Sequence, residues 1–371
     1  MNFDSFSFHP QIKAGIVAAG YSTPTPIQNQ TIPPIIEGHD ILGLAQTGTG
    51  KTAAFVLPIL QRLLVGPRRK LRALILAPTR ELVEQTHTVI QALGYRTGLR
   101  SITIYGGVSA QPQVRGLRDG AEIVVACPGR LLDLMGQKAV NLNSIEILVL
   151  DEADQMFDMG FLPAIRKILA VLPTQRQTLL FAATMPGEIR SFATDLLHHP
   201  VTVEIGARRP VETVSHAIYQ IEQDLKLETL LTLLSQSGKG QTLVFTRTKH
   251  RAQKIAVQLS KSGLAAKALQ GNLSQNRRQE VMDGFRNGRV RVMVATDIAS
   301  RGIDVSRITH VINFDMPNTV DAYTHRIGRT GRMANLGTAL TFVTQEDLPM
   351  LRTIEQLLGH AIERRKVGRA G

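Results

Sequence analysis

The chain has 371 residues, 43% of them hydrophobic, so it is long enough for two domains with proper cores and too apolar for a disordered protein. No uninterrupted apolar run of about 18 residues occurs, so no transmembrane helix is indicated, and the first residues lack the pattern of a secretory signal. The single cysteine, Cys127, excludes an internal disulfide and suits a reducing compartment. We therefore expect a cytoplasmic protein without a membrane partner.

The positive charge of the chain is unevenly placed. The formal net charge is +13. Residues 1–205 hold 18 Lys and Arg against 16 Asp and Glu, whereas residues 206–371 hold 25 against 14, which gives net charges of +2 and +11. This asymmetry favours a polyanionic partner that is attracted mainly by the second half. Charge alone does not separate RNA from DNA or from an acidic surface.

Strand-like apolar runs alternate with helical patterns from about residue 40 onward, which indicates mostly parallel sheets covered by helices. In the first half we expect strands at Asp40–Leu44, Ala73–Ala77, Ser101–Tyr105, Glu122–Ala126, Ile145–Leu150, Thr178–Ala182 and Val201–Ile205, and helices at Thr52–Leu64 and Arg80–Leu93. Strands resume at Ser215–Ile221, Thr242–Phe245, Ala265–Leu269, Arg291–Ala295, His310–Phe314 and Thr338–Val343.

Between the two series lies a polar stretch, residues 206–214, that contains Gly and Pro and shows no periodicity, so we interpret it as a linker. The prediction is an α/β chain of two domains, 1–205 and 215–362. Residues 363–371 form a basic tail that we expect to be mobile.

The stretch Ala45-Gln46-Thr47-Gly48-Thr49-Gly50-Lys51-Thr52 follows the first strand and precedes an apolar-periodic helix. That context fits a phosphate-binding loop, because glycines let successive backbone N–H groups curl around phosphate oxygens at a helix N-terminus. Lys51 can reach the β- and γ-phosphates, and the Thr52 hydroxyl can ligate Mg²⁺. The alternative is a glycine-rich turn that only caps a helix. Ala45 departs mildly from the usual pattern, which begins with Gly.

An acidic stretch, Asp151-Glu152-Ala153-Asp154, follows the apolar run Ile145–Leu150. Ligands bind outside the carboxyl ends of parallel strands, and adjacent acids there are costly unless a metal or a base neutralises them. Lys51, Thr52, Asp151 and Glu152 are therefore predicted to converge on one Mg²⁺-nucleotide, with Glu152 acting on the attacking water. The alternative is an exposed acidic turn.

The second half supplies Tyr323-Thr324-His325-Arg326-Ile327-Gly328-Arg329-Thr330-Gly331-Arg332, in which three arginines follow one histidine. Arginines from one domain can stabilise transition-state charge on a γ-phosphate bound by another. The alternative interpretation is a solvated basic loop on a basic domain.

With the other motifs in order between Phe3 and Arg332, this set resembles the DEAD-box ATP-dependent RNA helicases, whose name the acidic stretch spells. The resemblance implies two tandem RecA-like domains, ATP and Mg²⁺ as cofactors and RNA as partner. It is closest to the bacterial RhlE-like branch. It further implies ribosomal or RNA-degradation proteins as partners and a monomeric chain.

By this resemblance, Gln28 in Gly20-Tyr21-Ser22-Thr23-Pro24-Thr25-Pro26-Ile27-Gln28 reads the adenine edge, and Phe3 stacks on the base. Phe6 and Phe8 lie near enough in sequence to leave that choice open. The implied nucleotide-binding set is Phe3, Tyr21, Gln28, Ala45, Gln46, Thr47, Gly48, Thr49, Gly50, Lys51, Thr52, Gly302 and Asp304. The implied catalytic set is Lys51, Asp151, Glu152, His325, Arg329 and Arg332, with Thr52 and Asp151 holding Mg²⁺ largely through water.

The resemblance also implies an RNA track along the backbone of one strand. In the first domain it comprises Pro78, Thr79, Arg80, Gly107, Cys127, Gly129 and Arg130. In the second domain it comprises Thr246, Arg247, Gly271, Gln275, Arg278 and Thr296.

The chain departs from the family pattern at two positions that matter. Cys127 stands where a threonine usually holds an RNA phosphate, and a thiol is the poorer donor. Ala182-Ala183-Thr184 stands where Ser-Ala-Thr is usual, and that serine is thought to tie this motif to the acidic loop. We therefore expect weakened coupling through Asp154, Ala182, Ala183 and Thr184, with Asp154 facing the second domain.

The leading functional prediction is RNA-stimulated ATP hydrolysis that unwinds short duplexes or remodels ribonucleoproteins by closure of two domains. A second hypothesis is a nucleotide-gated RNA clamp or annealing factor, which Ala182 favours. A third is a DNA helicase, which the motifs around Gln28 and Arg329 disfavour.

Overall fold

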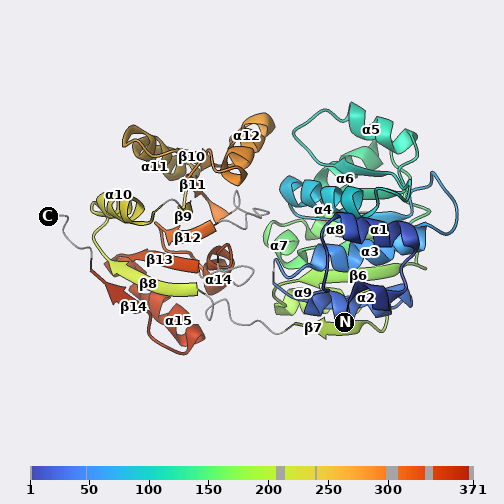
Figure 1. Ribbon diagram of the computed structural model, residues 1–371, viewed down its shortest axis with the longest axis horizontal. Helices are drawn as coiled ribbons and strands as arrows, with labels where there is room; N and C mark the ends of the chain where they lie inside the picture. Colours follow the sequence, from blue (N-terminus) through green and yellow to red (C-terminus); the bar gives the residue numbers. More distant parts are fainter. Residues whose placement is uncertain are drawn as a thin grey trace. The chain divides into compact units, whose positions relative to one another are not determined.

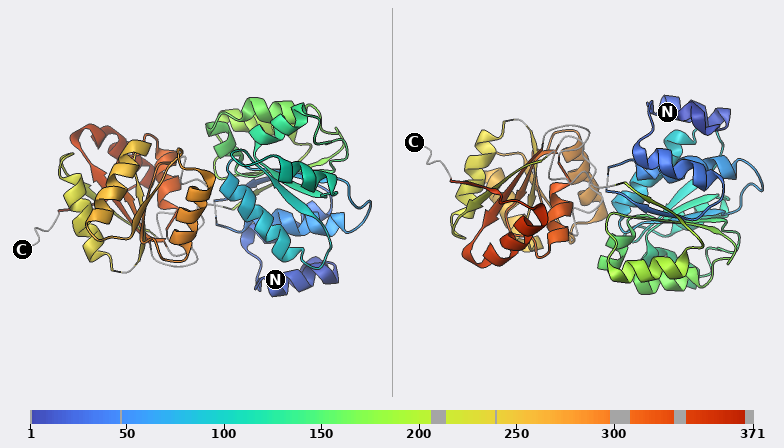
Figure 2. Two further views of the ribbon diagram at one scale, coloured as in Figure 1. Left: turned by 90° about the horizontal axis from the view of Figure 1, so that it is seen from above. Right: turned by 90° about the horizontal axis from the view of Figure 1, so that it is seen from below.

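A computed structural model describes residues 2–46, 48–205, 214–238, 240–297, 308–330 and 337–366. The chain divides into two compact units, Met1–Ala207 and Arg208–Gly371. Each unit is a parallel β-sheet with helices on both faces, as Figure 1 and the views from above and below in Figure 2 show. In the part of the chain that the structure describes, no helix combines the length and apolarity needed to cross a membrane.

The first unit holds a seven-stranded sheet in the order β3-β4-β2-β5-β6-β1-β7, in which neighbouring strands pair in parallel. Its strands are β1 Ile41–Leu44, β2 Ala73–Leu76, β3 Ser101–Ile104, β4 Ile123–Ala126, β5 Ile147–Leu150, β6 Gln177–Ala182 and β7 Val201–Glu204. Its helices are η1 Phe3–Phe6, α1 Pro10–Ala18, α2 Pro26–Ile36, α3 Lys51–Leu63, α4 Arg80–Leu93, α5 Gln111–Arg118, α6 Pro128–Gly136, α7 Ala153–Asp158, α8 Leu162–Leu169 and α9 Gly187–Leu196.

Side chains alternate between two apolar layers along each central strand of this sheet. In β5, Ile147 and Val149 join the cluster that includes α1, α3 and α4. Leu148 and Leu150 join the opposite cluster, which includes α6, α7, α8 and α9. Because both faces are covered, the strands read as continuous apolar runs, and their carboxyl ends open into the loops that carry the polar motifs.

The second unit repeats this architecture in the order β10-β11-β9-β12-β13-β8-β14. Its strands are β8 Val214–Gln220, β9 Gln241–Phe245, β10 Ala266–Leu269, β11 Val292–Ala295, β12 Ile308–Asn313, β13 Gly337–Val343 and β14 Glu363–Arg365. Its described helices are α10 Lys226–Gln236, α11 Lys249–Lys261, α12 Gln275–Arg286, α14 Val320–Ile327, η3 Gln345–Asp347 and α15 Leu348–Leu358.

The predicted α/β fold class is confirmed, and every predicted strand is present with its ends within two residues of the prediction. The prediction of a mobile tail is wrong for its first residues. Glu363–Arg365 forms β14, which pairs in parallel with Ala217, Ile218 and Tyr219 of β8. All three side chains of β14 are exposed, so backbone hydrogen bonds rather than an apolar pattern place this edge strand.

Candidate active site and RNA-binding residues

The loop after β1 has the backbone geometry of a phosphate cradle. Gly48 and Gly50 have φ of 87° and 94°, values that favour glycine, and Gly50 is the N-cap of α3. Lys51 is 6% exposed, and its ammonium donates to the Ala45 carbonyl oxygen at 2.7 Å. The Thr49 hydroxyl closes the loop by donating to the Gln46 carbonyl at 2.8 Å. The loop thus presents N–H groups at a helix N-terminus beside the Lys51 ammonium, which is fixed by its hydrogen bond to Ala45. Thr47 lies outside the described residues, and Thr52 is half-buried in the first turn of α3.

The predicted adenine-reading residue is bonded directly to this loop. Gln28 is 1% exposed, its side-chain N–H donates to the Gly50 carbonyl at 3.0 Å, and its side-chain oxygen accepts from the Thr25 N–H at 2.9 Å. A Cβ on Gly50 would lie 2.6 Å from the Gln28 amide nitrogen, so Gly50 must remain glycine for the two motifs to touch. Gln28 is therefore joined to the phosphate loop by a direct hydrogen bond.

Of the aromatic side chains predicted near the base, Phe3 and Phe8 are buried, at 5% and 3% exposure. Phe3 packs edge-on against both Phe6 and Tyr21, with ring centroids 6.0 Å apart in each pair. Tyr21 and Phe6 are only half-buried. Stacking by Phe3 stays a prediction, and Tyr21 offers the more accessible ring.

The acidic stretch follows β5, as predicted, but it is buried rather than an exposed turn. Asp151 and Glu152 are 2% and 3% exposed, and Glu152 has a left-handed φ of 52° as it enters α7. Burial raises the pKa of Asp151 from 3.8 to about 7, the Lys51 charge opposes this rise, and the Glu152 charge adds to it. Two adjacent buried acids beside a held lysine form an arrangement suited to a cationic ligand.

The third carboxylate of the stretch has a different partner from the one expected. Asp154 is 3% exposed, and its Oδ2 accepts from the Ala183 N–H at 3.0 Å, the Thr184 N–H at 2.9 Å and the Thr184 hydroxyl at 3.2 Å. The expectation that Asp154 faces the second domain is therefore wrong, because all three donors belong to its own unit. The link between the acidic loop and the segment after β6 exists without a serine hydroxyl.

The same segment also contacts the phosphate loop. The Ala182 carbonyl accepts from the Ala45 N–H at 3.0 Å, and Ala182 itself is fully buried at the end of β6. The residues from Ala182 to Thr184 therefore bond to the start of the phosphate loop on one side and to Asp154 on the other. The segment after β6 thus connects the phosphate loop and the acidic loop by direct hydrogen bonds.

The residues present fit a Mg²⁺-bound nucleotide. Asp151 Oδ1 is buried and has no hydrogen-bond partner among the described residues. A buried carboxylate oxygen without a donor is costly unless a cation or a water completes it. Mg²⁺ commonly keeps water and phosphate ligands and needs only one or two protein carboxylates, so Asp151 is the carboxylate that would serve it here.

The RNA-track residues predicted after β2 and β3 lie together. Thr79 caps α4, with its hydroxyl accepting from the Leu82 N–H at 3.3 Å, and Pro78 precedes it. The guanidinium of Arg80, the first residue of α4, lies 5.9 Å from the Tyr105 ring. A Cβ on Gly107, whose φ is 78°, would lie 2.2 Å from a terminal nitrogen of Arg80. The glycine thus makes room for the arginine.

The predicted residues after β4 complete this group. Arg130 donates to the Val108 carbonyl at 3.1 Å, which ties α6 to the glycine loop. A Cβ on Gly129 would meet no atom within 4 Å, so the backbone there is accessible. Cys127 is half-buried, and burial raises its pKa to about 12, so it stays a thiol, a weak donor to phosphate. The structure thus brings the first-unit RNA residues to the carboxyl ends of neighbouring strands.

In the second unit, Thr246 is fully buried, and its hydroxyl donates to the Thr248 carbonyl at 3.2 Å. The RNA contact predicted for Thr246 is corrected accordingly, because its side chain is internal. The Arg247 N–H donates to Asp315 Oδ2 at 2.9 Å, and its guanidinium lies 3.9 Å from Asp347 Oδ1.

The other RNA residues predicted in this unit lie at nearby strand and helix ends. Gly271 follows β10, with no atom within 4 Å of a built Cβ. Gln275 begins α12, Arg278 lies one turn later, and Thr296 directly follows β11. Their contact with RNA stays a prediction.

The basic stretch begins in α14. His325 Nε2 is buried and has no hydrogen-bond partner among the described residues, and Arg329 is 5% exposed. Gly302, Asp304 and Arg332 lie outside the described residues, so their predicted roles stay predictions.

Sequence reasoning missed the role of Arg326 between these residues. Its guanidinium donates to both carboxylate oxygens of Asp297, at 2.6 and 2.8 Å, and also to Asn313 Oδ1 and the Asp315 carbonyl. It also lies 5.0 Å from the Phe245 ring. Arg326 therefore fixes the basic stretch to the carboxyl ends of β9 and β12 and to the residues that follow β11 and β12. The signal in the sequence was its position next to His325 in the basic stretch.

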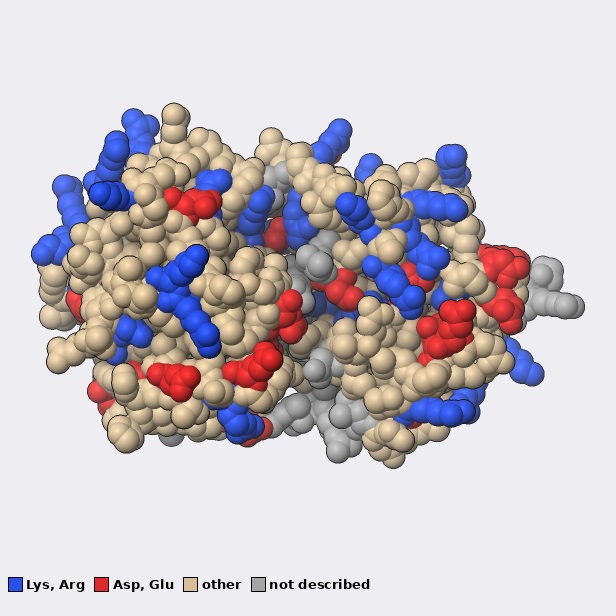
Figure 3. Space-filling model, turned by 180° about the vertical axis from the view of Figure 1, so that it is seen from behind, with Lys and Arg blue, Asp and Glu red and all other residues tan. Residues whose placement is uncertain are grey.

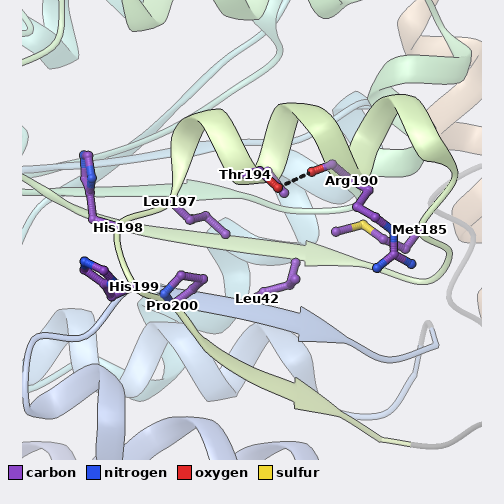
Figure 4. A pocket seen from close by; sticks show the side chains of 9 residues that line it. Leu42, Met185, Arg190, Thr194, Leu197, His198, His199 and Pro200 are labelled. Carbon is purple, nitrogen blue, oxygen red and sulfur yellow. Dashed lines mark hydrogen bonds between the residues drawn. The ribbon is translucent and has the colours of Figure 1, made fainter.

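A cavity of about 430 Å³ lies elsewhere, between α9 and β1. Figure 4 shows Arg190 and Met185 at one end and His198 and His199 at the other, with Leu42 between them. No predicted site residue lines it, so the cavity is separate from the nucleotide site.

Comparisons with known proteins agree with this geometry. Residues 25–192 match the model of the DEAD/DEAH box helicase family, and residues 225–334 match the helicase conserved C-terminal domain. The chain therefore belongs to the DEAD-box helicase family.

Two curated relatives are similar along nearly the whole chain. The DEAD-box ATP-dependent RNA helicase CshA of Streptococcus pneumoniae is 42% identical over 358 residues, which cover 96% of this chain and 68% of the relative. CshA of Bacillus subtilis is 39% identical over 368 residues, which cover 99% and 74%. The solved structure of Dbp5 from S. cerevisiae, bound to RNA and ADP BeF3, is 30% identical, with a TM-score of 0.87 over 98% of this chain and 95% of that chain. Placement in the RhlE-like branch stays a prediction.

Proposed function

We propose that this chain is an ATP-dependent RNA helicase whose RNA-stimulated ATP hydrolysis separates short duplexes locally or remodels ribonucleoproteins. The observation that carries the proposal is the bonding from Asp154 through Thr184 and Ala182 to the phosphate loop, which joins the residues predicted for hydrolysis to those predicted for coupling. The curated relatives named above are RNA helicases, which supports the substrate class.

The residues of the first unit divide the chemistry among them. Lys51 balances phosphate charge from within a nearly closed site. Glu152 accepts a proton from the attacking water, and its position beside Asp151 disfavours two negative charges until a cation is present. Thr52 and Asp151 would hold Mg²⁺, which neutralises phosphate charge when bound. Hydrolysis thus depends on a complete ligand set.

RNA binding is expected to ignore base sequence. The first-unit track presents arginines, helix N-termini and an open glycine backbone, groups that contact phosphate rather than base edges. Only 5% of the residues are aromatic, and none of the residues predicted for the first-unit track is, so base stacking contributes little at that track. Binding should therefore depend strongly on salt.

The test measures ATP turnover without nucleic acid, with RNA and with DNA of the same sequence, and then strand separation on duplexes of increasing length. We expect stimulation by RNA, and rates that fall as the duplex lengthens, because the separation is local. Equal stimulation by DNA would favour a DNA helicase. Undiminished rates on duplexes of several turns would contradict local separation.

The clamp hypothesis loses its supporting observation. It rested on Ala182, which lacks the hydroxyl expected to reach the acidic loop, but Ala183 and Thr184 supply that link. The distinguishing measurement compares ATP turnover with strand separation in the unaltered chain and in Ala182→Ser. Turnover without separation, restored by serine, would revive the clamp hypothesis.

The proposal includes a cytoplasmic location and a monomeric chain, with ribosomal or RNA-degradation proteins as partners. The single cysteine is compatible with the first of these. Sedimentation of the purified chain over a range of concentrations tests the second, and a dimer would contradict it.

A further inference from the structure

Three loops of the first unit meet at the edge of the sheet opposite the motif loops. Residues 64–72, 94–100 and 119–122 lead into the amino ends of β2, β3 and β4, respectively. These strands are neighbours in the order β3-β4-β2. Each has four residues, so about 13 Å of strand separates this edge from the RNA-track loops at the carboxyl ends.

One buried carboxylate joins the three loops. Glu122 is 1% exposed, and it accepts from the Arg68 guanidinium at 2.9 Å, the Arg69 N–H at 3.0 Å and the Arg100 N–H at 2.8 Å. The Arg100 guanidinium donates to the Asp119 carbonyl at 2.8 Å. The loops are therefore held in a defined arrangement rather than left independent.

The surface that results is strongly basic. With Arg118 at the end of α5 included and the buried Arg72 left out, these loops hold six cations, all exposed, against two carboxylates, a net charge of +4. The cations are Arg68, Arg69, Lys70, Arg96, Arg100 and Arg118. Residues 1–205 together carry only +2, so the rest of that range is net negative and the positive charge is concentrated here.

Most of this charge is not neutralised internally. Among the described residues, Arg68 pairs with Glu122, whereas the other five cations form no ion pair. The Glu146 carboxylate at the start of the adjacent strand is itself taken up by Arg72, at 2.6 Å. In Figure 3 more Lys and Arg than Asp and Glu side chains lie along the left-hand margin of the first unit.

An exposed aromatic ring lies within the basic surface. Tyr95 is 51% exposed, and the Arg96 guanidinium lies 5.3 Å from its ring centroid. Aromatic rings beside cations are the usual platform for stacking nucleotide bases without regard to sequence. An acidic protein surface would use the charge but would leave this ring without a function.

We propose that this basic edge is a second RNA-binding surface, which holds a segment of RNA that flanks the strand bound at the motif loops. The inference rests on the proposed function for the identity of the polyanion. Because the two edges lie at opposite ends of the strands, only an RNA longer than the motif site can engage both. Linking two sites on one RNA raises affinity through effective concentration.

The experiment compares binding of a short RNA of about 8 nucleotides and a long RNA of about 30 nucleotides to the full chain, by fluorescence anisotropy at several salt concentrations. The basic-edge variant carries Arg69→Gln, Lys70→Gln and Arg96→Gln. The matched control carries Lys138→Gln, Arg166→Gln and Lys167→Gln, which removes the same charge from exposed positions outside the three loops. Arg69 and Lys138 also match in backbone, with φ of 57° and 52°.

We expect the basic-edge variant to lower the ratio of long-RNA to short-RNA affinity roughly five-fold or more, and the control to change it less than about two-fold. The slope of log affinity against log salt for long RNA should fall by about 2, since each lost single-strand phosphate contact accounts for about 0.7. An equal effect of both variants, or no change in the ratio, would overturn the inference. An unaltered chain that binds neither RNA would instead contradict the proposed function.

Tyr95 supplies an independent test. Tyr95→Ala should weaken long-RNA binding roughly five-fold or more, whereas Tyr95→Phe keeps the ring and should retain it. Ultraviolet crosslinking to long RNA should label the peptide that contains Tyr95. Unchanged binding by Tyr95→Ala together with an unlabelled peptide would overturn the stacking role. If the basic edge bound polyglutamate but not RNA, its partner would instead be an acidic protein.

Discussion

Glu122 and Asp151 are both buried carboxylates of the first unit, at opposite edges of one sheet, but their surroundings differ. Burial alone would raise the pKa of Glu122, yet hydrogen bonds from Arg69, Arg100 and Arg68 outweigh burial and lower it. Asp151 lacks such a donor set, Oδ1 has no described partner, and burial raises its pKa to about 7. Burial by itself therefore does not distinguish the two acids; Asp151 differs in having a buried oxygen without a donor beside the Glu152 and Lys51 charges.

The largest expected effect is at the neighbour of Asp151. Glu152→Gln keeps the shape of the side chain but cannot accept the proton from water, so turnover of ATP with RNA should fall by about 10²- to 10⁴-fold. Steady-state phosphate release measures it. Glu188→Gln, an exposed acid in α9, is the control and should be unaffected. Full activity of Glu152→Gln would contradict the role of Glu152 as the base that accepts the proton from water.

Glu122→Gln tests whether the hydrogen bonds to Glu122 stabilise the first unit. It leaves the Arg68 guanidinium without its ion pair and places an amide N–H against backbone donors, so the first unit should lose about 2–3 kcal/mol of stability. Hydrogen–deuterium exchange of the β4 amides in the full chain measures the loss. The exposed Glu204→Gln should change it by less than about 0.5 kcal/mol. Equal protection in the two variants would contradict the role given to Glu122.

The effect of the hydrogen bonds to Asp154 can be tested separately from the effect of having alanine rather than serine at position 182. Thr184→Ala removes the hydroxyl bond of 3.2 Å, so the ratio of strand separation to ATP turnover should fall several-fold, on the order of 1 kcal/mol of coupling. Ala182→Ser adds a hydroxyl at a fully buried position where the link already exists, and it should change the ratio less than about two-fold. The reverse ranking would show that the serine position governs coupling.

The smallest effect concerns pH. Because the folded-state pKa of Asp151 is raised, the cost of burying its charge is absent near pH 4 and fully present above about 7. Asp151→Asn removes that cost, so the nucleotide-free protein should gain roughly 1 kcal/mol or more at pH 8, and less at pH 5. Hydrogen exchange of the β5 amides, corrected for intrinsic rates, tests it. A larger gain at pH 5 than at pH 8 would have the wrong sign.

The sequence predicted the strands well because buried parallel strands are continuous apolar runs, as in Ile147–Leu150. It missed β14 because Glu363, Arg364 and Arg365 are exposed and charged, and only backbone pairing with β8 defines that strand. An edge strand without an apolar face leaves no periodic signal.

The residue types of the candidate site could be predicted from the sequence, but their bonding could not. Gln28 bonds to the phosphate loop, Lys51 bonds within it and Asp151 follows β5, and their roles in ligand binding stay predictions. The partner of Asp154 was missed because two of its three donors are backbone N–H groups, which every residue but proline carries. For the same reason, the alanine at position 182 wrongly suggested that the contact with the acidic loop is lost. Side-chain identity shows which group is missing but not which backbone group replaces it.

If a Mg²⁺-bound nucleotide completes the unpartnered oxygen of Asp151, nucleotide affinity depends on both the metal and this carboxylate. The affinity for a fluorescent ATP analogue, measured with Mg²⁺ and with a chelator, should be about ten-fold or more higher with Mg²⁺ in the unaltered chain and less than about two-fold higher in Asp151→Asn. Full Mg²⁺ dependence in Asp151→Asn would contradict this role of Asp151.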